Sequence, residues 1–121
     1  ISEGSDVGYC KVLHFENDIP LMLEERYVNH AIVPDFVKQK YGDTETPSGY
    51  LQRHFPVSEM EHTIEAILAS KAIANALSIK ENAPCLQLSR RTWTENTLIS
   101  YVNMISAGSR YKLKLHSRID N

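Results

Sequence analysis

Hydrophobic and polar residues alternate along several stretches of this chain, which is the pattern of β-strands with one buried face. Gly8–Phe15 and Leu21–Asn29 are predicted to be two strands joined by a turn over Glu16–Pro20. Pro84–Ser106 is predicted to be a second hairpin, because β-branched and aromatic residues dominate both of its arms. The polar residues Glu95-Asn96-Thr97 separate those arms and supply its turn.

Tyr111–Ile119 shows the cleanest alternation and is predicted to be a final strand. Its apolar side carries Tyr111, Leu113, Leu115 and Ile119, and its polar side carries Lys112, Lys114, His116 and Arg118. Such alternation is typical of a sheet with one solvated face, so a mostly antiparallel sheet is expected.

Short helices are predicted between the strands. Pro34-Asp35 opens a helix that Gly42 ends, and Pro47–His54 forms another, with Thr46 as its N-cap. Ser70–Ser78 is a third, alanine-rich helix.

Ser58–Ser70 fits two structures. Ser58-Glu59-Met60-Glu61 has the form of a capping box, and the apolar residues that follow fit a helical stripe. The alternative is a strand through His62–Leu68, followed by a helix capped by Ser70. Periodicity alone favours the helix.

The two hairpins resemble each other, which indicates an internal repeat. Placing Ile1 on Ile79 aligns both regions without a gap, so that Glu3 falls on Glu81, Phe15 on Trp93, Leu21 on Ile99 and Leu23 on Tyr101. The turn segments Glu16-Asn17-Asp18 and Glu95-Asn96-Thr97 fall one position apart. Two such hairpins facing each other would leave a groove between them, where we expect the functional site.

The repeat also bears on where the chain begins. Ile79 follows a predicted helix, whereas Ile1 opens the chain. We therefore expect a fold that lacks its first strand and helix, in the carboxy-terminal part of a longer protein.

Composition limits the domain count and the class of partner. With 121 residues, 42% of them hydrophobic, residues 1–121 are expected to form one domain without a membrane span or signal peptide. Cys10 and Cys85 are expected to be buried thiols of a cytoplasmic protein. A net charge of −2 disfavours a direct grip on nucleic acid by this segment.

Several chemistries lack their sequence patterns. The five histidines fall on five predicted elements without metal-ligand spacing, so no metal is expected. The chain has no phosphate-binding loop, no dinucleotide fingerprint and no serine in a nucleophile elbow. No cofactor is expected.

Glu24 and Arg26 share one strand face with Met22, which places a carboxylate beside a guanidinium. This pair is either a solvated ion pair or the wall of a pocket, and the pair alone does not decide between them. The repeat adds neighbours, because a shared groove would be lined by His14, Glu24, Arg26, Arg90, Thr92 and Ser100. Donors, an acceptor and apolar surface without an activated nucleophile favour binding over catalysis.

Five segments together resemble a known family. They are Pro20–Asn29 (PLMLEERYVN), Thr46–Leu51 (TPSGYL), Thr63–Ala69 (TIEAILA), Ala83–Thr94 (APCLQLSRRTWT) and Gly108–Leu113 (GSRYKL). They are similar to the effector-binding UTRA domain of HutC-type regulators of the GntR family. EERYVN with the preceding HFENDIP is most similar to the histidine-utilisation repressor branch.

The resemblance implies an α+β fold of the chorismate-lyase type, an antiparallel sheet with short helices packed on it. It implies a homodimer that binds a small effector, urocanate in the histidine-utilisation branch, and that contacts operator DNA through a separate winged helix-turn-helix domain. It also implies a strand near His62–Leu68 in place of the helix. The rival function is a chorismate-lyase-like enzyme on the same fold, which the absence of catalytic groups disfavours.

The resemblance also implies site residues. Relatives that bind sugar phosphates contact the ligand at positions occupied here by Val12, His14, Glu24, Thr46, Ser48, Ser100 and Ser106. Those relatives hold phosphate with arginines at the positions of Val12 and His14, so a sugar phosphate is a poor candidate here. For a planar imidazole acid, Arg26 or Arg90 would hold the carboxylate, and Glu24 or His14 would contact the ring nitrogens.

Overall fold

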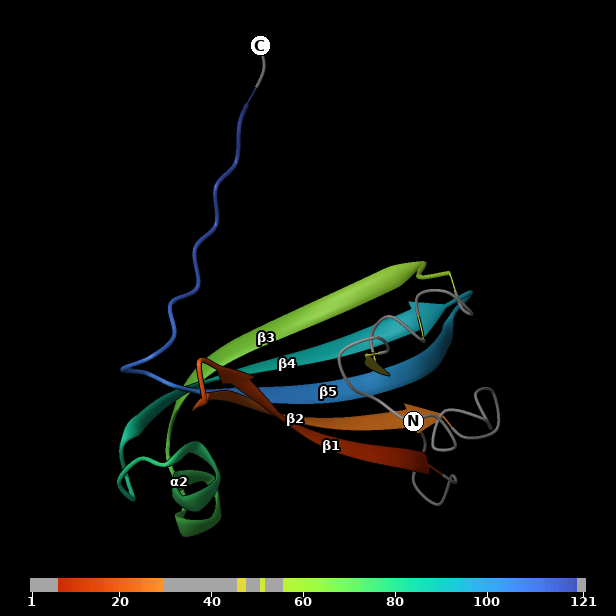
Figure 1. The fold of residues 1–121 in the computed structure, drawn as a ribbon. Helices are drawn as coiled ribbons and strands as arrows, with labels where there is room; N and C mark the ends of the chain where they lie inside the picture. Colours follow the sequence, from red (N-terminus) through yellow and green to blue (C-terminus); the bar gives the residue numbers. More distant parts are fainter. Residues whose placement is uncertain (1–6, 30–45, 48–50, 52–55, 120–121) are drawn as a thin grey trace.

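The computed structural model describes residues 7–29, 46–47, 51 and 56–119. Its elements are β1 (Val7–Glu16), β2 (Ile19–Asn29), β3 (Glu59–Leu68), α2 (Lys71–Leu77), β4 (Pro84–Thr94) and β5 (Thr97–Ala107). The strands form one antiparallel sheet in the order β1-β2-β5-β4-β3 (Figure 1). The predicted class is confirmed. The helix predicted from Pro34 to Gly42 lies outside the described residues, and of the next one Pro47 and Leu51 are described and helical.

Both hairpins close with two-residue turns whose backbone lies in the left-handed region. Asn17 and Asp18 have φ of 50° and 65°, and Glu95 and Asn96 have φ of 47° and 65°. Such turns match the right-handed twist of paired strands. The pairing register shifts between His14 and Phe15 in one hairpin and between Thr92 and Trp93 in the other.

The predicted repeat is therefore confirmed in detail. Turns and register shifts recur at the offset that places Ile1 on Ile79. The two turns themselves fall in register, because Asn17 corresponds structurally to Glu95 and Asp18 to Asn96, so the similar turn motifs lie one position apart as the alignment has them.

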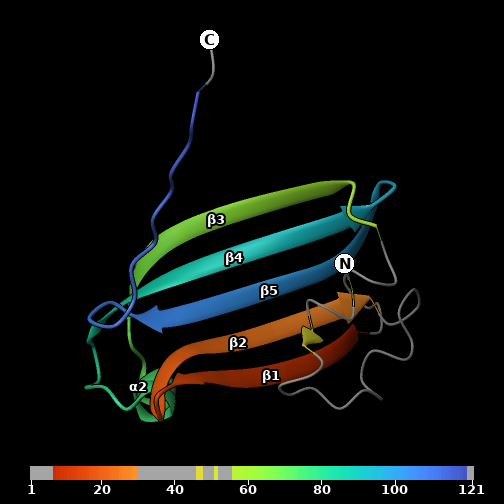
Figure 2. The ribbon, with the colours of Figure 1, turned by 45° about the horizontal axis from the view of Figure 1, so that its top comes forward.

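The hairpins lie edge to edge rather than face to face (Figure 2). β2 pairs with β5, and Glu25 stands opposite Asn103, its own equivalent in the repeat. This pairing places a local twofold axis perpendicular to the sheet. The predicted groove between two facing hairpins is wrong, and equivalent residues of the two hairpins instead line the same face of one sheet.

The helix α2 packs on one face, at the end where β2 begins and β5 ends (Figure 1). Ser70 caps its first turn by accepting from the Ile73 amide, and Ser78 ends it with φ of 54°. The core beneath it contains Leu23, Ala69, Ala74, Leu77, Cys85 and Ile105. We call this side the α2 face and the other side the Glu24 face. No described helix is long and apolar enough to cross a membrane.

Residues 59–68 form a strand, so the helix that periodicity favoured is wrong and the family's expectation is confirmed. β3 pairs with β4 along its whole length, with Ile64 opposite Leu88. Met60, Ile64 and Leu68 are spaced by four residues, which places them on one side of either a helix or a strand. The spacing could therefore not distinguish the two structures.

The predicted final strand at Tyr111–Ile119 is wrong. Residues 111–119 have no strand assignment and run away from the sheet (Figures 1 and 2), with Leu115 86% exposed. Alternation alone does not make a strand, because a strand also needs a neighbouring strand with which it can form backbone hydrogen bonds. No neighbouring strand is present among the described residues of this chain.

Candidate functional site

The buried carboxylate of Glu24 contacts two side chains on the Glu24 face, the His14 imidazole and the Arg26 guanidinium. Its Oε1 lies 3.1 Å from Nε2 of His14, and its Oε2 accepts from Nε of Arg26 at 3.1 Å. Glu24 is 5% exposed and Arg26 is 3% exposed. Strand alternation places Glu24 and Arg26 on the same side of β2, and the β1–β2 register brings His14 beside them. Since charges are rarely buried without a function or a partner, this cluster is the leading candidate site.

Arg90 adds a second guanidinium to the cluster. It stands on β4 opposite Val102 of β5, which in turn stands opposite Arg26 of β2. Burial, and next the positive charge of Arg26, lower the pKa of Arg90, while Glu24 opposes this shift. The described charged side chains of this face are thus two guanidiniums and one carboxylate. Guanidiniums are suited to hold a carboxylate through paired hydrogen bonds.

The other predicted site residues fall in two groups. Thr92, Ser100 and Ser106 lie on the Glu24 face, where both serines are buried and Thr92 is half-buried. Thr46 is exposed and belongs to no strand, and Ser48 lies outside the described residues. The structure thus brings together His14, Glu24, Arg26, Arg90, Thr92, Ser100 and Ser106 on one surface. Their use in ligand binding remains a proposal.

Sequence reasoning missed Cys10 as a member of this surface. Cys10 stands opposite Arg26 across β1 and β2 and is a half-buried free thiol. Burial, and then the charge of Glu24, raise the pKa of the thiol, against a lowering by Arg26. A thiol kept protonated is a poor nucleophile, so the arrangement favours binding over covalent chemistry. Cys10 lies two residues before Val12 on the same strand, so strand alternation in the sequence already placed both side chains on one face.

The other predicted thiol, Cys85, is buried in the core under α2. Burial raises its pKa. Both cysteines are free thiols, as predicted, although Cys10 is only partly buried.

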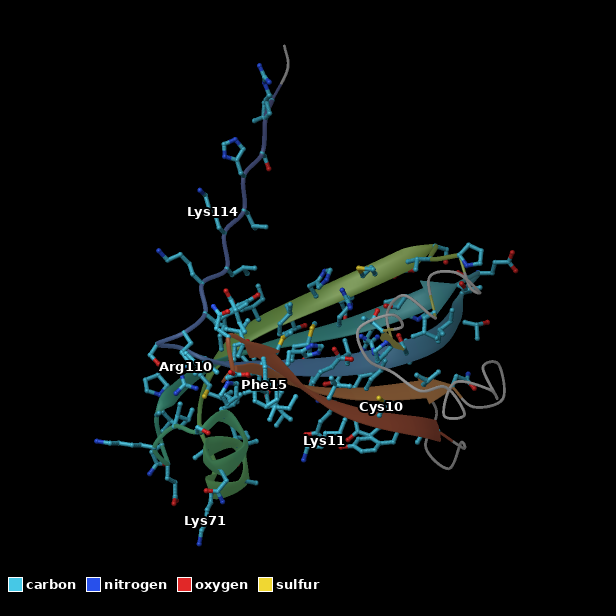
Figure 3. All side chains as sticks on the ribbon, in the orientation of Figure 1. Cys10, Lys11, Phe15, Lys71, Arg110 and Lys114 are labelled. Carbon is cyan, nitrogen blue, oxygen red and sulfur yellow. The ribbon has the colours of Figure 1, made fainter. Side chains whose placement is uncertain are left out.

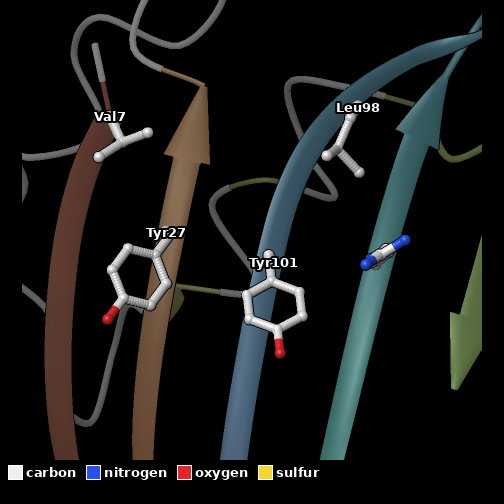
Figure 4. Close-up of a pocket in the computed structure, with 5 residues that line it drawn as sticks. Val7, Tyr27, Leu98 and Tyr101 are labelled. Atoms are coloured by element: carbon white, nitrogen blue, oxygen red, sulfur yellow. The ribbon is translucent and has the colours of Figure 1, made fainter. Parts of the chain in front are cut away.

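The α2 face carries a hollow beyond the part that α2 covers. It has a volume of about 410 Å³ and is lined by Val7, Tyr27, Arg91, Leu98 and Tyr101 (Figure 4). The Tyr27 and Tyr101 ring centroids lie 6.4 Å apart, and the Arg91 guanidinium lies 6.0 Å from the Tyr101 centroid. Arg91 is 3.8 Å from Glu61, and both side chains are largely exposed. Because its charges are solvated, this hollow ranks below the buried cluster as a candidate site.

Tyr9, on the same face, forms a hydrogen bond that shifts its pKa. Its hydroxyl donates to Glu25 at 2.7 Å, and this bond, followed by partial burial and the charge of Glu25, raises the pKa of Tyr9 to about 12 from 10.0. The folded-state pKa exceeds the unfolded one, so this contribution to stability is complete below pH 10.0 and declines as the pH approaches 12.

We expect Tyr9→Phe to remove that pH-dependent contribution to the free energy of unfolding. In a near-ultraviolet titration, the unmodified protein should show a tyrosine transition near pH 12, and this transition should be missing in Tyr9→Phe. Ionisation of Tyr9 near the ordinary tyrosine pKa would contradict the expectation.

Comparison with known proteins identifies the family. The model of the UTRA domain family matches residues 1–112. The chain belongs to the UTRA domain family. Among proteins similar to this UTRA domain is the histidine utilization repressor of Pseudomonas aeruginosa, 40% identical over 114 residues, covering 94% of this chain and 45% of that protein. The histidine utilization repressor of Klebsiella aerogenes is 38% identical, covering 94% of this chain and 47% of that protein.

Solved structures agree with the family assignment. The C-terminal domain of the histidine utilization repressor from Pseudomonas syringae pv. tomato superposes with a TM-score of 0.92 and 38% identity, covering 98% of this chain and 84% of that one. A GntR-family transcriptional regulator from Enterococcus faecalis gives a TM-score of 0.78 and 27% identity, covering 97% of this chain and 85% of that one.

The predicted resemblance to the histidine-utilisation branch is thus confirmed. These relatives are named repressors and regulators, so the UTRA domain belongs with regulator domains rather than enzymes. It spans about half the length of the curated relatives it matches.

Proposed function

We propose that this UTRA domain is the effector-binding domain of a transcriptional repressor of histidine-utilisation genes, with urocanate as its inducer. The observation that carries the proposal is the buried cluster of Glu24, Arg26 and Arg90 with His14 on one face of the sheet. The names of the relatives support the regulatory role. The chemistry of the cluster supports a small anion with hydrogen-bonding nitrogens.

Urocanate combines a carboxylate with a planar imidazole ring, and the cluster offers a complement to each. In this proposal Arg90 holds the carboxylate through its planar guanidinium, and Arg26, which donates to Glu24 through Nε, holds that acid in place. The ring nitrogens contact Glu24 or His14, which already form a carboxylate–imidazole pair at 3.1 Å. Val12, opposite Glu24, brings no cation for a phosphate group.

The regulatory step in this proposal is a shift between two dimer geometries. A ligand that binds one dimer geometry more tightly increases the population of that geometry. In that geometry the spacing of the two DNA-binding heads no longer matches the operator half-sites. Those heads would belong to a separate domain of the complete cytoplasmic repressor, because this domain has a net charge of −2.

The test is calorimetric titration of the domain with urocanate, histidine and glucosamine 6-phosphate. We expect saturable urocanate binding that weakens by about 10- to 100-fold in Arg90→Met, the loss typical of a hydrogen bond to a charged group. Arg91→Met is the matched control, because adjacent strand residues point to opposite faces and Arg91 lies in the hollow on the α2 face. Urocanate affinity should be unchanged in that variant.

The alternative outcomes have separate meanings. Tight binding of glucosamine 6-phosphate without urocanate binding would retain an effector domain and reject the histidine-utilisation assignment. Equal losses in Arg90→Met and Arg91→Met would reject the Glu24 face as the site. Binding of none of the three compounds would overturn the proposed effector class.

A further inference from the structure

The first hairpin contains a bulge beside the candidate site. The pairing steps from Pro20 to Met22 between two adjacent residues of β1, so Leu21 is an extra residue in β2. His14 is one of those two residues of β1, and its imidazole contacts the buried carboxylate of the site. A bulge bends its strand and changes the direction in which nearby side chains point. The geometry of this bulge therefore helps to set where the imidazole lies.

The guanidinium of Arg110 connects this bulge to the end of α2. It donates to the backbone oxygen of Pro20 at 3.2 Å and to that of Ser78, the C-cap of α2, at 3.0 Å. It also donates to the backbone oxygen of Leu77, the last residue of the helix. Figure 3 shows Arg110 at the end of the sheet where α2 packs. One side chain thus holds the start of β2 against the carbonyl end of the helix.

Arg110 itself projects from a tight turn. Its amide donates to the Ala107 oxygen at 3.0 Å, and the Gly108 amide donates to the Pro84 oxygen at the start of β4 at 2.9 Å. A Cβ added at Gly108 would lie 2.9 Å from that same oxygen, closer than Cβ atoms approach other atoms in proteins. The turn is therefore held against β4, and the guanidinium reaches the bulge from a fixed base.

The second hairpin has a bulge at the equivalent position, and a side chain bonds to it in the same way. Ile99 is the extra residue there, and the backbone oxygen of Leu98 before it accepts from the Asn29 side chain at 3.3 Å. Leu98 corresponds to Pro20 in the repeat. A bulge disrupts the ladder locally, so a side-chain donor can bond to a carbonyl beside it. In both hairpins the carbonyl that precedes the extra residue is held by such a donor, which indicates that these bonds fix the bulges.

We propose that Arg110 is a positioning residue of the effector site and acts through the bulge on His14. This inference rests on the proposed function for the ligand, and adds a residue outside the Glu24 face. Without the guanidinium, the start of β2 can move relative to α2, and the His14–Glu24 contact forms in only a fraction of the molecules. The apparent affinity for a ligand that needs this contact falls by that fraction. Because the bonds are to helix backbone oxygens, truncating a side chain of α2 leaves them in place.

The test first observes His14 in the ligand-free 121-residue chain by nuclear magnetic resonance. The ring signal of His14 is assigned by its loss in His14→Gln. We expect Arg110→Met to shift or broaden this signal, because the imidazole then occupies more than one position. Lys80→Met is the matched control. It removes one positive charge at an exposed position just after α2, and should leave the His14 signal unchanged.

Calorimetric titration with urocanate then measures the effect on the site. We expect Arg110→Met to weaken urocanate binding by about 3- to 10-fold, and by less than about twofold in the His14→Gln background. A residue that acts through His14 has little left to change once that imidazole is gone. Arg110→Lys should show a smaller loss, because it keeps the charge but lacks the planar group that spans the oxygens of β2 and α2. It also replaces Arg110→Met in the test if that variant fails to fold.

Two results would overturn the proposal. An unchanged His14 signal, or an unchanged affinity in a chain whose parent binds urocanate, would make Arg110 a residue of stability alone. Losses of Arg110→Met and His14→Gln that simply add would show that Arg110 acts by another route. A shifted His14 signal in a chain whose parent binds no urocanate would support the role of Arg110 and reject the proposed ligand, so the two proposals fail separately.

Discussion

Replacing Arg26 by alanine is expected to lower the free energy of unfolding by about 3–5 kcal/mol, the cost of removing one partner from a buried ion pair. Arg26 is 3% exposed and donates to Glu24, which is itself 5% exposed. Removing the guanidinium leaves the carboxylate buried with His14 as its remaining partner among these contacts. The measurement is urea denaturation followed by circular dichroism, with the free energy extrapolated to water.

Two further variants make that expectation specific. Arg91→Ala removes an arginine from the α2 face, where the pair with Glu61 is exposed, and should cost no more than about 1 kcal/mol. The double variant Glu24→Leu with Arg26→Met removes both charges and should be far more stable than Arg26→Ala, because no buried charge is left without its partner. A double variant as unstable as the single one would show that packing, rather than charge pairing, accounts for the loss.

The repeat is the part of the fold that the sequence predicted best. Strand alternation and polar turn residues are local signals, and they located β1, β2, β4 and β5. The two register shifts seen in the structure follow the same alignment, which carries His14 onto Thr92. What the alignment could not give was how the hairpins meet. That depends on β2 pairing with β5, a contact between distant parts of the chain.

Two elements were predicted wrongly for related reasons. The spacing of Met60, Ile64 and Leu68 is consistent with both a helix and a strand, and pairing with β4 decides for the strand. Tyr111–Ile119 has strand alternation without a described neighbour in its own chain. In both cases the deciding interaction is a backbone ladder with another segment, which periodicity does not encode.

The candidate site was predicted to the level of a face, but not to the level of contacts. The alternation that placed Glu24 with Arg26 and the repeat that added Arg90 both depend only on strand parity. That Glu24 bridges His14 and Arg26 through its two oxygens depends on register and rotamers and had to come from the structure. Cys10 carries no charge and belongs to no motif, so only the register of β1 with β2 places it opposite Arg26.

The two faces of the sheet differ in what they bury. Apolar packing is concentrated under α2, while the opposite face buries charges at a cost in desolvation that apolar residues of similar volume would avoid. Buried charged side chains of this kind are often found at functional sites. The core under α2 must therefore supply much of the stability that this sheet needs to hold a charged cluster in place.

That division leads to the second large expected effect, which is on the core. Leu77, the last residue of α2, is fully buried with 0% exposure and packs in the cluster with Leu23, Ala74 and Ile105. Leu77→Ala is expected to lower the free energy of unfolding by about 2–5 kcal/mol, through lost apolar burial and the cavity left behind. The urocanate affinity of the folded fraction should stay unchanged, because the Glu24 face lies on the other side of the sheet.

Leu68→Ala is the matched control for that loss. Leu68 is 64% exposed at the end of β3, so the same truncation should change the free energy of unfolding by no more than about 0.5 kcal/mol. Urea denaturation of the three proteins gives the stabilities, and calorimetry at low denaturant gives the affinities. If Leu77→Ala weakened urocanate binding as strongly as Arg90→Met while remaining folded, packing under α2 would be coupled to the Glu24 face. The separation of the two faces would then be wrong, because α2 would act as a positioning element for the ligand site.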